Sequence, residues 1–511
     1  MERKKIVCLL FILAITIFFR VWKLGEIPPG VHPDAARNGI DALDAIKTND
    51  YKVFYPENFG REGLFINLTA LSLKIFGIYP FSLEIVSAII GILTVIGAYF
   101  LTKEFYNERI ALIASFLLAT SFWHVLFSRL GLRGIMVPFT LVFLFYFFLR
   151  GLKRESALDF LIAGVFLGLG FHTYPSFRMT ILILPLLIIP YWKIYKENKK
   201  LRKYITLLFC FLFLALIVAS PLILYFLKNP EYFSTRANDV FVFNQENAFK
   251  KFLISTISHL GMFNIYGDPN WRHNFSEQPM LPCCVGVCFV GGIITIIWRL
   301  FSQKEKLINL FLLSWFLIML LPGILTFSPG GVPHALRTLG VVPVVYIFAA
   351  IFLDFLINFF LKNCEIKYQK IILGFFLLFL IYVGAIEGKK YFYDWGQNPK
   401  VRESFFENFV NAAYYLKNFQ NEICVSDRAN EMEFITYNNK NIHYFFPSEL
   451  QKIKNFCDKP KSIIVIIDYN LERKVMVENI LNRKLIQEED LNFGLGGKTL
   501  KIFKVSDVNP I

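Results

Sequence analysis

The chain has 511 residues, of which 55% are hydrophobic and 17% are aromatic, and its mean hydropathy is +0.49. This composition excludes an ordinary soluble protein and indicates a polytopic membrane protein. The formal net charge of +15 does not require a nucleic-acid partner, because short basic loops between membrane spans produce the same excess of Lys and Arg.

Apolar runs long enough to cross a bilayer, which takes about 20 residues, recur from Ile6 to about Glu387. The runs predict eleven spans, at residues 6–22, 80–102, 109–127, 134–150, 157–171, 179–195, 204–227, 281–300, 307–327, 338–361 and 371–387. No small-residue cleavage site follows the first run, so we expect an uncleaved span there. The composition then becomes polar, which predicts a transmembrane domain over residues 1–388 and a soluble domain over residues 389–511.

A further apolar run, residues 64–76, is short and carries several polar side chains. If it does not cross the membrane, six loops on one side carry 20 Lys and Arg residues, and the three short opposite loops carry four. The positive-inside rule favours this arrangement and places the basic side in the cytoplasm. We therefore expect an interfacial helix at about residues 64–78, after a first outer loop at about residues 23–63. The protein is then a multi-pass plasma- or inner-membrane protein with a cytoplasmic N-terminus and an extracytoplasmic tail domain.

The outward loops contain the unusual polar clusters of the sequence, which suggests a shared cavity on that side. These clusters supply His32, Asp34 and Arg37; Arg61 and Glu62; Arg133; His172, Tyr174 and Arg178; Arg272 and His273; and His334 and Arg337.

An outward aspartate among arginines at a membrane surface fits the transfer of a sugar from a polyprenyl phosphate. Guanidinium groups bind phosphate through paired hydrogen bonds, and phosphate leaves without a catalytic acid. The acceptor hydroxyl needs a base, which contributes about 10²–10⁴-fold, and we assign this role to Asp34. The anomeric centre would be inverted. The donor-phosphate candidates are Arg37, Arg61, Arg133, Arg178 and Arg337, and the sugar or acceptor candidates are His32, Glu62, His172, Tyr174, Arg272, His273 and His334.

Each of these residues also has a simpler interpretation. Asp34 follows a proline and could only cap a helix or form a turn. A loop arginine could contact a lipid headgroup, and His172 or His334 could be a hydrogen-bonded structural group. The co-location of six clusters, rather than any one member, favours a site.

The tail has a mixed α/β pattern. Helical spacing covers Arg402–Phe419, and Ser462–Ile467 is a buried-strand pattern. Weaker strand candidates are Glu422–Ser426, Phe434–Tyr437, Ile442–Phe446 and Thr499–Val505. Cys424 and Cys457 could form a disulfide in an extracytoplasmic domain or remain two buried thiols, and both alternatives stay open.

Over about residues 1–390 the chain resembles the protein O-mannosyltransferase/aminoarabinose-transferase superfamily, which has the GT-C fold and is similar to glycosyltransferase family 39. The motifs in order are His32-Pro-Asp34-Ala-Ala-Arg37-Asn-Gly, Gly60-Arg-Glu-Gly-Leu-Phe-Ile, Phe127-Ser-Arg-Leu-Gly-Leu-Arg133, His172-Thr-Tyr-Pro-Ser-Phe-Arg178, Gly267-Asp-Pro-Asn-Trp-Arg-His-Asn274 and His334-Ala-Leu-Arg-Thr-Leu-Gly340.

This resemblance implies an α-helical GT-C membrane domain with a polyprenyl-phosphate sugar donor, a pair of flat helices in the first outer loop, and Asp34 at the family's catalytic acidic position. The family usually has Asp-Glu there, whereas this chain has Asp34-Ala35, so the role of a second carboxylate is in doubt. Ion dependence varies across the superfamily. The sequence therefore assigns no metal and leaves a divalent ion open.

Two other functions remain as alternatives. A transporter or flippase of lipid-linked sugars would be expected to hold ionisable residues near mid-bilayer and to show repeat symmetry, neither of which the sequence displays. A glycan polymerase or oligosaccharide ligase would use similar lipid chemistry with a larger donor. The acceptor is open in every case.

Overall fold

The computed structural model describes residues 2–301, 305–327, 331–491 and 499–507. The chain groups into two compact units by its contacts. We call them the membrane unit (Met1–Trp22, Tyr51–Phe65 and Ile85–Tyr391) and the tail unit (Lys23–Asp50, Ile66–Glu84 and Phe392–Ile511). The division expected at residue 388 remains a prediction. The grouping puts a boundary at residue 391 and adds two segments of the first outer region to the tail unit.

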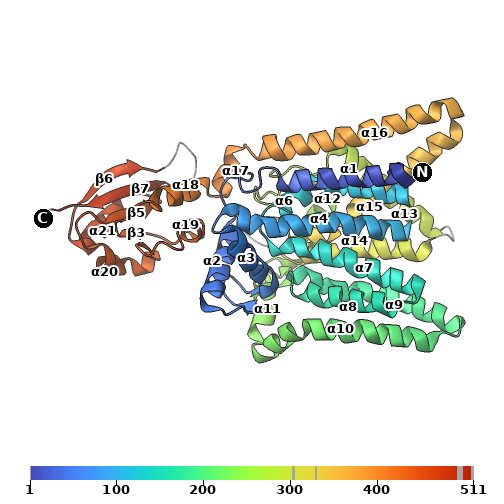
Figure 1. Ribbon diagram of the computed structural model, residues 1–511, viewed down its shortest axis with the longest axis horizontal. Coiled ribbons are helices and arrows are strands. Elements are labelled where there is room, and N and C mark those ends of the chain that lie inside the picture. Colours follow the sequence, from blue (N-terminus) through green and yellow to red (C-terminus); the bar gives the residue numbers. More distant parts are fainter. Residues whose placement is uncertain (1, 302–304, 328–330, 492–498, 508–511) are drawn as a thin grey trace. The chain divides into compact units, whose positions relative to one another are not determined.

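The membrane unit is a bundle of long helices (Figure 1). Its principal helices are α1 (Glu2–Val21), α4 (Pro80–Phe105, whose first residues group with the tail unit), α5 (Glu108–Thr120), α6 (Phe122–Phe127), α7 (Met136–Arg154), α8 (Ala157–Phe171), α9 (Thr180–Glu197), α10 (Leu201–Lys228), α13 (Cys283–Phe301), α14 (Lys306–Ile324), α15 (Val342–Asn363) and α16 (Ile366–Lys389).

Shorter elements join these helices. They are strands β1 (Phe54–Tyr55) and β2 (Arg61–Glu62), helices α11 (Glu231–Val240) and α12 (Ala248–Gly261), the 3₁₀ turns η1 (Arg133–Ile135), η2 (Pro175–Met179), η3 (Val242–Asn244) and η4 (Leu339–Val341), and the π-helical segment η5 (Lys390–Trp395).

Each of the eleven expected spans falls mainly on helix. Within the described residues, eight helices are long and apolar enough to cross a membrane, and α8 is a shorter apolar helix. The chain is therefore a multi-pass membrane protein. The span expected at residues 109–127 is interrupted at Ser121, which separates α5 from α6. The guanidinium of Arg20 donates to the carbonyl of Ala119 at 2.8 Å, so it satisfies a group that the interruption leaves without a helical partner.

The basic loops meet at one end of the bundle, as the charge pattern predicts. Lys5 pairs with Glu108 at 2.7 Å, and Lys153 pairs with Glu104 at 3.1 Å. Lys200 and Lys203 both bind the carboxylate of Glu155, which lowers the pKa of that group. These ion pairs join the loops before α5, after α7 and before α10.

Helix α8 packs between α7 and α10, and two of its glycines allow the close approach to α10. A Cβ atom on Gly164 would lie 2.3 Å from the carbonyl oxygen of Phe211, and one on Gly168 would lie 2.7 Å from that of Ala215. The two glycines are four residues apart on one helix face. Small residues at this spacing let membrane helices pack backbone to backbone.

The tail unit contains a five-stranded sheet with the strand order β4-β3-β5-β7-β6. Strands β3, β4 and β5 run parallel to one another, whereas β7 pairs antiparallel with β5 and β6. The C-terminal segment of the unit contains, in chain order, α17 (Pro399–Ser404), α18 (Glu407–Leu416), β3 (Ile423–Val425), α19 (Asn430–Ile435), β4 (Ile442–Tyr444), η6 (Pro447–Ile453), α20 (Lys454–Cys457), β5 (Ile463–Ile467), α21 (Leu471–Leu481), β6 (Leu485–Asp490) and β7 (Leu500–Val505).

Four of the expected strands are confirmed, but Phe434–Tyr437 is wrong as a strand. Phe434 and Ile435 end helix α19, because their buried side chains pack on the helical face rather than along a ladder. The single helix expected over Arg402–Phe419 is also wrong. It breaks at Phe406, which has a φ of 53°, and the carbonyl of Phe405 accepts from Val31 at 2.9 Å. Cys424 and Cys457 form a disulfide in the buried core of the unit.

The tail unit also holds two helices from the first outer region, α2 (Pro33–Thr48) and most of α3 (Gly63–Phe76). The interfacial helix expected at about residues 64–78 is therefore present as a helix. Helix α2 packs against α19, where a Cβ atom on Gly39 would come within 2.7 Å of the Phe434 ring. The phenol of Tyr437 donates to Asp44 on the same helix. The C-terminal domain thus fixes the helix that carries Asp34.

Candidate functional site

A buried carboxylate gathers two predicted arginines in the membrane unit. Glu62 is 2% exposed and lies at the end of β2. One of its oxygens is 3.0 Å from Nε of Arg133, in η1, and the other is 3.7 Å from Nη2 of Arg178, in η2. Three segments that are distant in sequence therefore converge on one carboxylate. We call these three side chains the Glu62 cluster.

Neighbouring groups hold the two guanidiniums in place. The ring of Tyr174 lies against Arg133, 5.4 Å from the guanidinium carbon to the ring centroid. Arg178 donates to the backbone carbonyl of Phe233 at 3.0 Å and stacks on that ring at 4.5 Å. Arg61, next to Glu62, is 1% exposed, and its Nε donates to the carbonyl of Glu57 at 3.3 Å. The cluster therefore combines fixed positive charge with aromatic surfaces.

Asp34 belongs to the tail unit, where it is the second residue of helix α2. Pro33 begins the helix, and His32 is the N-cap, with Nδ1 accepting from the backbone N–H of Asp34 at 3.1 Å. His32 therefore takes the capping role that a simple interpretation would give to Asp34. The carboxylate lies in the first helical turn, where the helix dipole favours negative charge. Arg37 pairs with Asp41 one turn later, at 2.7 Å.

The loop before Asp34 is tightly packed within the tail unit. Gly30 has a φ of 84°, and a Cβ atom there would lie 2.2 Å from the carbonyl oxygen of Phe405. A side chain at this position would therefore displace the loop that leads into α2. The predicted proximity of Asp34 to Arg61, Arg133, Arg178 and Arg337 stays a prediction, because Asp34 and those four arginines belong to separate units.

A second group of predicted residues comes together in the membrane unit. Nδ1 of His273 lies 3.4 Å from a carboxylate oxygen of Asp268, and the rings of His273 and His334 are 5.0 Å apart between centroids. The backbone N–H of His334 donates to Nε2 of His259 at 3.1 Å. Burial lowers the pKa of His259 to about 4, so its ring is neutral at pH 7 and accepts this bond.

The other candidates make contacts of their own. His172 donates from Nε2 to the carbonyl of Val218 in α10 at 2.9 Å. Arg272 directly precedes His273, and the charge of Arg337 acts on His259 and lowers its pKa. Sequence reasoning also missed Asp268 as a site residue, although it lies in one of the quoted motifs, five residues before His273.

Two buried arginines near the outer helix ends serve the framework. Nη2 of Arg20 is 2.6 Å from Nδ1 of His124, which accepts. Arg129 donates to the carbonyl of Phe19, near the end of α1, and to the phenol of Tyr391, each at 3.1 Å. Both side chains are fully buried. Their guanidiniums satisfy backbone carbonyls at helix ends. No sequence pattern distinguishes an arginine in this role from an arginine that binds an anion.

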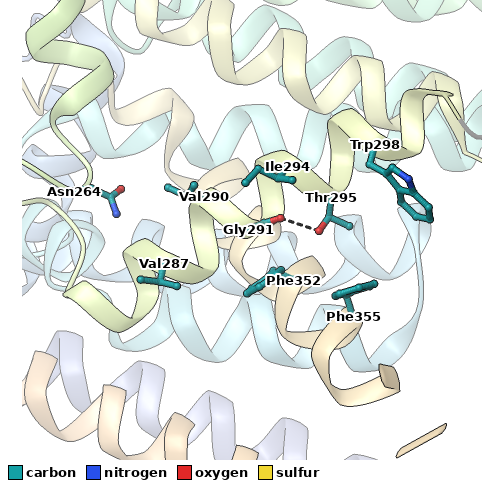
Figure 2. Close-up of a pocket in the computed structure, with 9 residues that line it drawn as sticks. All are labelled: Asn264, Val287, Val290, Gly291, Ile294, Thr295, Trp298, Phe352 and Phe355. Carbon is teal, nitrogen blue, oxygen red and sulfur yellow. Dashed lines mark hydrogen bonds between the residues drawn. The ribbon is translucent and has the colours of Figure 1, made fainter. Parts of the chain in front are cut away.

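A separate groove of about 570 Å³ lies along α13 and α15 (Figure 2). Its lining is mostly apolar, and the hydroxyl of Thr295 is already bonded to the carbonyl of Gly291 at 2.7 Å. None of its lining residues is a predicted site residue or a titratable group. Because it lies along two membrane-spanning helices, this groove has the character of a lipid-contacting surface rather than a reaction site.

Comparison with solved structures defines the fold. ArnT from Cupriavidus metallidurans in the apo state has a TM-score of 0.60 at 10% identity, covering 99% of this chain and 98% of that chain. ArnT bound to undecaprenyl phosphate gives 0.58 at 11% identity, with coverages of 98% and 97%. The oligosaccharyltransferase AglB from Archaeoglobus fulgidus, in complex with an inhibitory peptide and a dolichol-phosphate, gives 0.53 at 14% identity, with coverages of 94% and 71%.

The chain has the GT-C glycosyltransferase fold. Residues 64–225, less than half of the chain, also match the family model described as dolichyl-phosphate-mannose-protein mannosyltransferase. No curated protein matches the chain. The expected fold class is therefore confirmed, and the family match agrees with the resemblance seen in the motifs.

Proposed function

We propose that the chain transfers a sugar from a polyprenyl phosphate to an extracytoplasmic acceptor, with inversion at the anomeric carbon. The observation that carries this proposal is the Glu62 cluster on a GT-C fold. The cluster joins three loops at the end of the bundle opposite the basic loops, where the headgroup of a membrane lipid would lie.

The charge of the cluster favours an anionic ligand. Two guanidiniums face one carboxylate, so the three side chains carry a net charge of +1 by formal count. Glu62 and Tyr174 hold the guanidinium of Arg133 in one orientation. Less side-chain entropy is therefore lost when an anion binds to it. Arginine forks bind phosphate oxygens in pairs and stabilise the charge that develops on a phosphate leaving group. The cluster therefore suits the donor phosphate better than it suits a neutral sugar.

Asp34 is proposed as the general base. In this reaction the acceptor hydroxyl oxygen attacks the anomeric carbon, and the bond between that carbon and the phosphate oxygen breaks. The carboxylate of Asp34 takes the hydroxyl proton, and the polyprenyl phosphate leaves with the bonding electron pair. A base of this kind contributes about 10²–10⁴-fold to the rate. Ala35 leaves no second carboxylate beside it.

The solved relatives support the class of donor. ArnT was solved with undecaprenyl phosphate bound, and AglB was solved with a dolichol-phosphate. Both ligands are polyprenyl phosphates, which place a phosphate at the headgroup level of a bilayer. A polyprenyl-phosphate sugar is therefore the donor class we assign.

The direct test compares wild type with Asp34→Asn in transfer from a polyprenyl-phosphate sugar, using purified full-length protein. The acceptor is water or a detergent-extracted envelope fraction, and released polyprenyl phosphate is the readout. We expect kcat to fall by about 10²-fold or more with little change in KM, because the base acts on the acceptor. Asp50→Asn, an exposed carboxylate near the end of the same loop, is the matched control.

Two results would reject the proposal. One is undiminished turnover in a folded Asp34→Asn variant. The other is movement of intact lipid-linked sugar across vesicles with no glycosyl bond broken, which would identify a flippase instead.

A further inference from the structure

Asp268, His273 and His334, none of which is a member of the Glu62 cluster, place three metal-binding atoms together. One ligand atom from each residue lies within 4.8 Å of the others. Asp268 and His273 come from the loop between α12 and α13, and His334 comes from the loop between α14 and α15. Asp268 is 2% exposed and His273 is 8% exposed. His334 is partly buried. Charged and polar side chains are rarely this deeply buried unless they are paired.

The distance between the first two ligands fits a bound cation better than a hydrogen bond. Two ligands that are each about 2.0–2.1 Å from a tetrahedral zinc ion lie about 3.3 Å apart. Nδ1 of His273 lies 3.4 Å from Oδ2 of Asp268, which is longer than a good N–H···O bond.

The carboxylate is held in place by the backbone. Its Oδ1 accepts from the N–H of Asn270 at 2.8 Å, and its Oδ2 accepts from the N–H of Ala335 at 2.7 Å. The second bond joins the two loops directly beside His334. Metal-binding carboxylates are typically oriented by such outer hydrogen bonds.

The His334 side is also fixed. The N–H of His334 donates to Nε2 of His259, and Nδ1 of His259 donates to the carbonyl of Ser255 at 2.7 Å. A Cβ atom on Gly331 would come within 2.8 Å of the Pro269 ring, so the two loops pack closely before His334. The segment that bears His334 is therefore positioned in part by contacts that do not involve the His334 side chain.

We propose that Asp268, His273 and His334 bind one divalent cation of the zinc class, with a fourth coordination position open to water or to a phosphate oxygen. Imidazole nitrogens favour zinc and its neighbours over magnesium or calcium, which prefer all-oxygen sites. The ion would cross-link the loop before α13 to the loop before α15. This inference concerns residues outside the Glu62 cluster, and it does not depend on the proposed glycosyl transfer.

The test measures zinc bound to the full-length protein in detergent after removal of metal with EDTA. We expect wild type to take up one zinc ion per chain on titration with zinc chloride, measured by mass spectrometry of the metal and by calorimetry. His273→Ala and His334→Ala should each weaken zinc binding by about 100-fold or more. His443→Ala is the matched control, because His443 also faces a carboxylate, Glu422, at 2.9 Å but belongs to no cluster of three ligands within the described residues.

Cobalt substitution of wild type keeps the proposal testable even if the variants fail to fold. Cobalt at an Asp/His₂ site should give visible d–d absorption without a cobalt–thiolate band, which separates it from binding at Cys283 or Cys284. The proposal is overturned if metal-free wild type takes up no zinc. Unchanged zinc affinity in folded His273→Ala and His334→Ala, or a thiolate band, would overturn it equally.

Discussion

Replacing Glu62 by glutamine removes the charge that holds Arg133 and Arg178 together while leaving the side-chain volume nearly unchanged. The carboxylate is 2% exposed and approaches the two guanidiniums at 3.0 and 3.7 Å. With an effective dielectric constant of about 20, each pair contributes about 5 kcal/mol of direct attraction before desolvation is subtracted. Breaking a buried ion pair typically costs about 3–5 kcal/mol, because a charge is left buried and uncompensated.

We expect Glu62→Gln to lower the free energy of unfolding by about 3 kcal/mol, at the low end of that range, since the amide oxygen still accepts one hydrogen bond. Donor lipid should instead raise the stability of the variant. A polyprenyl phosphate would supply the missing negative charge, so it should raise the melting temperature of the variant more than that of wild type.

The assay is thermal unfolding in detergent with and without a polyprenyl phosphate. Glu57→Gln, an exposed carboxylate in the same loop, is the control for loss of one negative charge. The reasoning fails if Glu62→Gln is as stable as Glu57→Gln. It also fails if the lipid stabilises the variant less than it stabilises wild type, because the cluster would then hold the loops without binding phosphate.

Three further predictions concern the framework. Replacing both Cys424 and Cys457 by serine should lower the free energy of unfolding of the tail domain by about 3–4 kcal/mol, because the disulfide closes a separation of 33 residues. Denaturant unfolding measures this change, and an unchanged unfolding curve would contradict the prediction. Gly164→Ala should cost about 1–3 kcal/mol, because its Cβ meets the Phe211 carbonyl, whereas Gly374→Ala, with nothing within 4 Å, should cost nothing in the same thermal assay. In a background of serine at the free cysteines, an impermeant maleimide should label Asp50→Cys on intact cells and Lys199→Cys only after permeabilisation; the reverse pattern would invert the topology.

The helices could be predicted because each depends on a local property. Length and hydropathy define a span within one segment, and the surplus of Lys and Arg defines one side of the bundle. The ion pairs of Lys5 with Glu108 and of Lys200 with Glu155 agree with that assignment of loops to one end. The interruption at Ser121 was not predictable, because the apolar run continues through it and the guanidinium that stabilises it comes from Arg20.

The errors in the tail have the same origin. Phe434-Ile435 is a short apolar pair that fits either a strand or a helix, and the contact with Gly39 belongs to a segment almost four hundred residues earlier. The break between α17 and α18 depends on the bond from Val31 to Phe405, which spacing within residues 402–419 does not reveal. Strand β6 also pairs with β7 without a strong pattern of its own.

For the site, the sequence supplied candidate residues, but it did not show how they group. Glu62, Arg133, Tyr174 and Arg178 were separate candidates, and their convergence depends on three loops meeting. Arg37 pairs with Asp41 on its own helix, and its place near the donor phosphate stays a prediction. Asp268 is a single acidic residue in a loop, and only the return of the chain at His334 gives it two histidine neighbours.

The central claim is that Arg133 and Arg178 bind the phosphate of a lipid carrier, and mass spectrometry of co-purifying lipid tests it most directly. Wild type and the Arg133→Gln/Arg178→Gln double variant would be purified in the same mild detergent and their bound lipids compared. The account predicts a phosphorylated polyprenol, with or without a sugar, on wild type and its loss from the double variant. The claim is contradicted if wild type carries only bulk phospholipids, or if the double variant retains the phosphorylated polyprenol at the same occupancy.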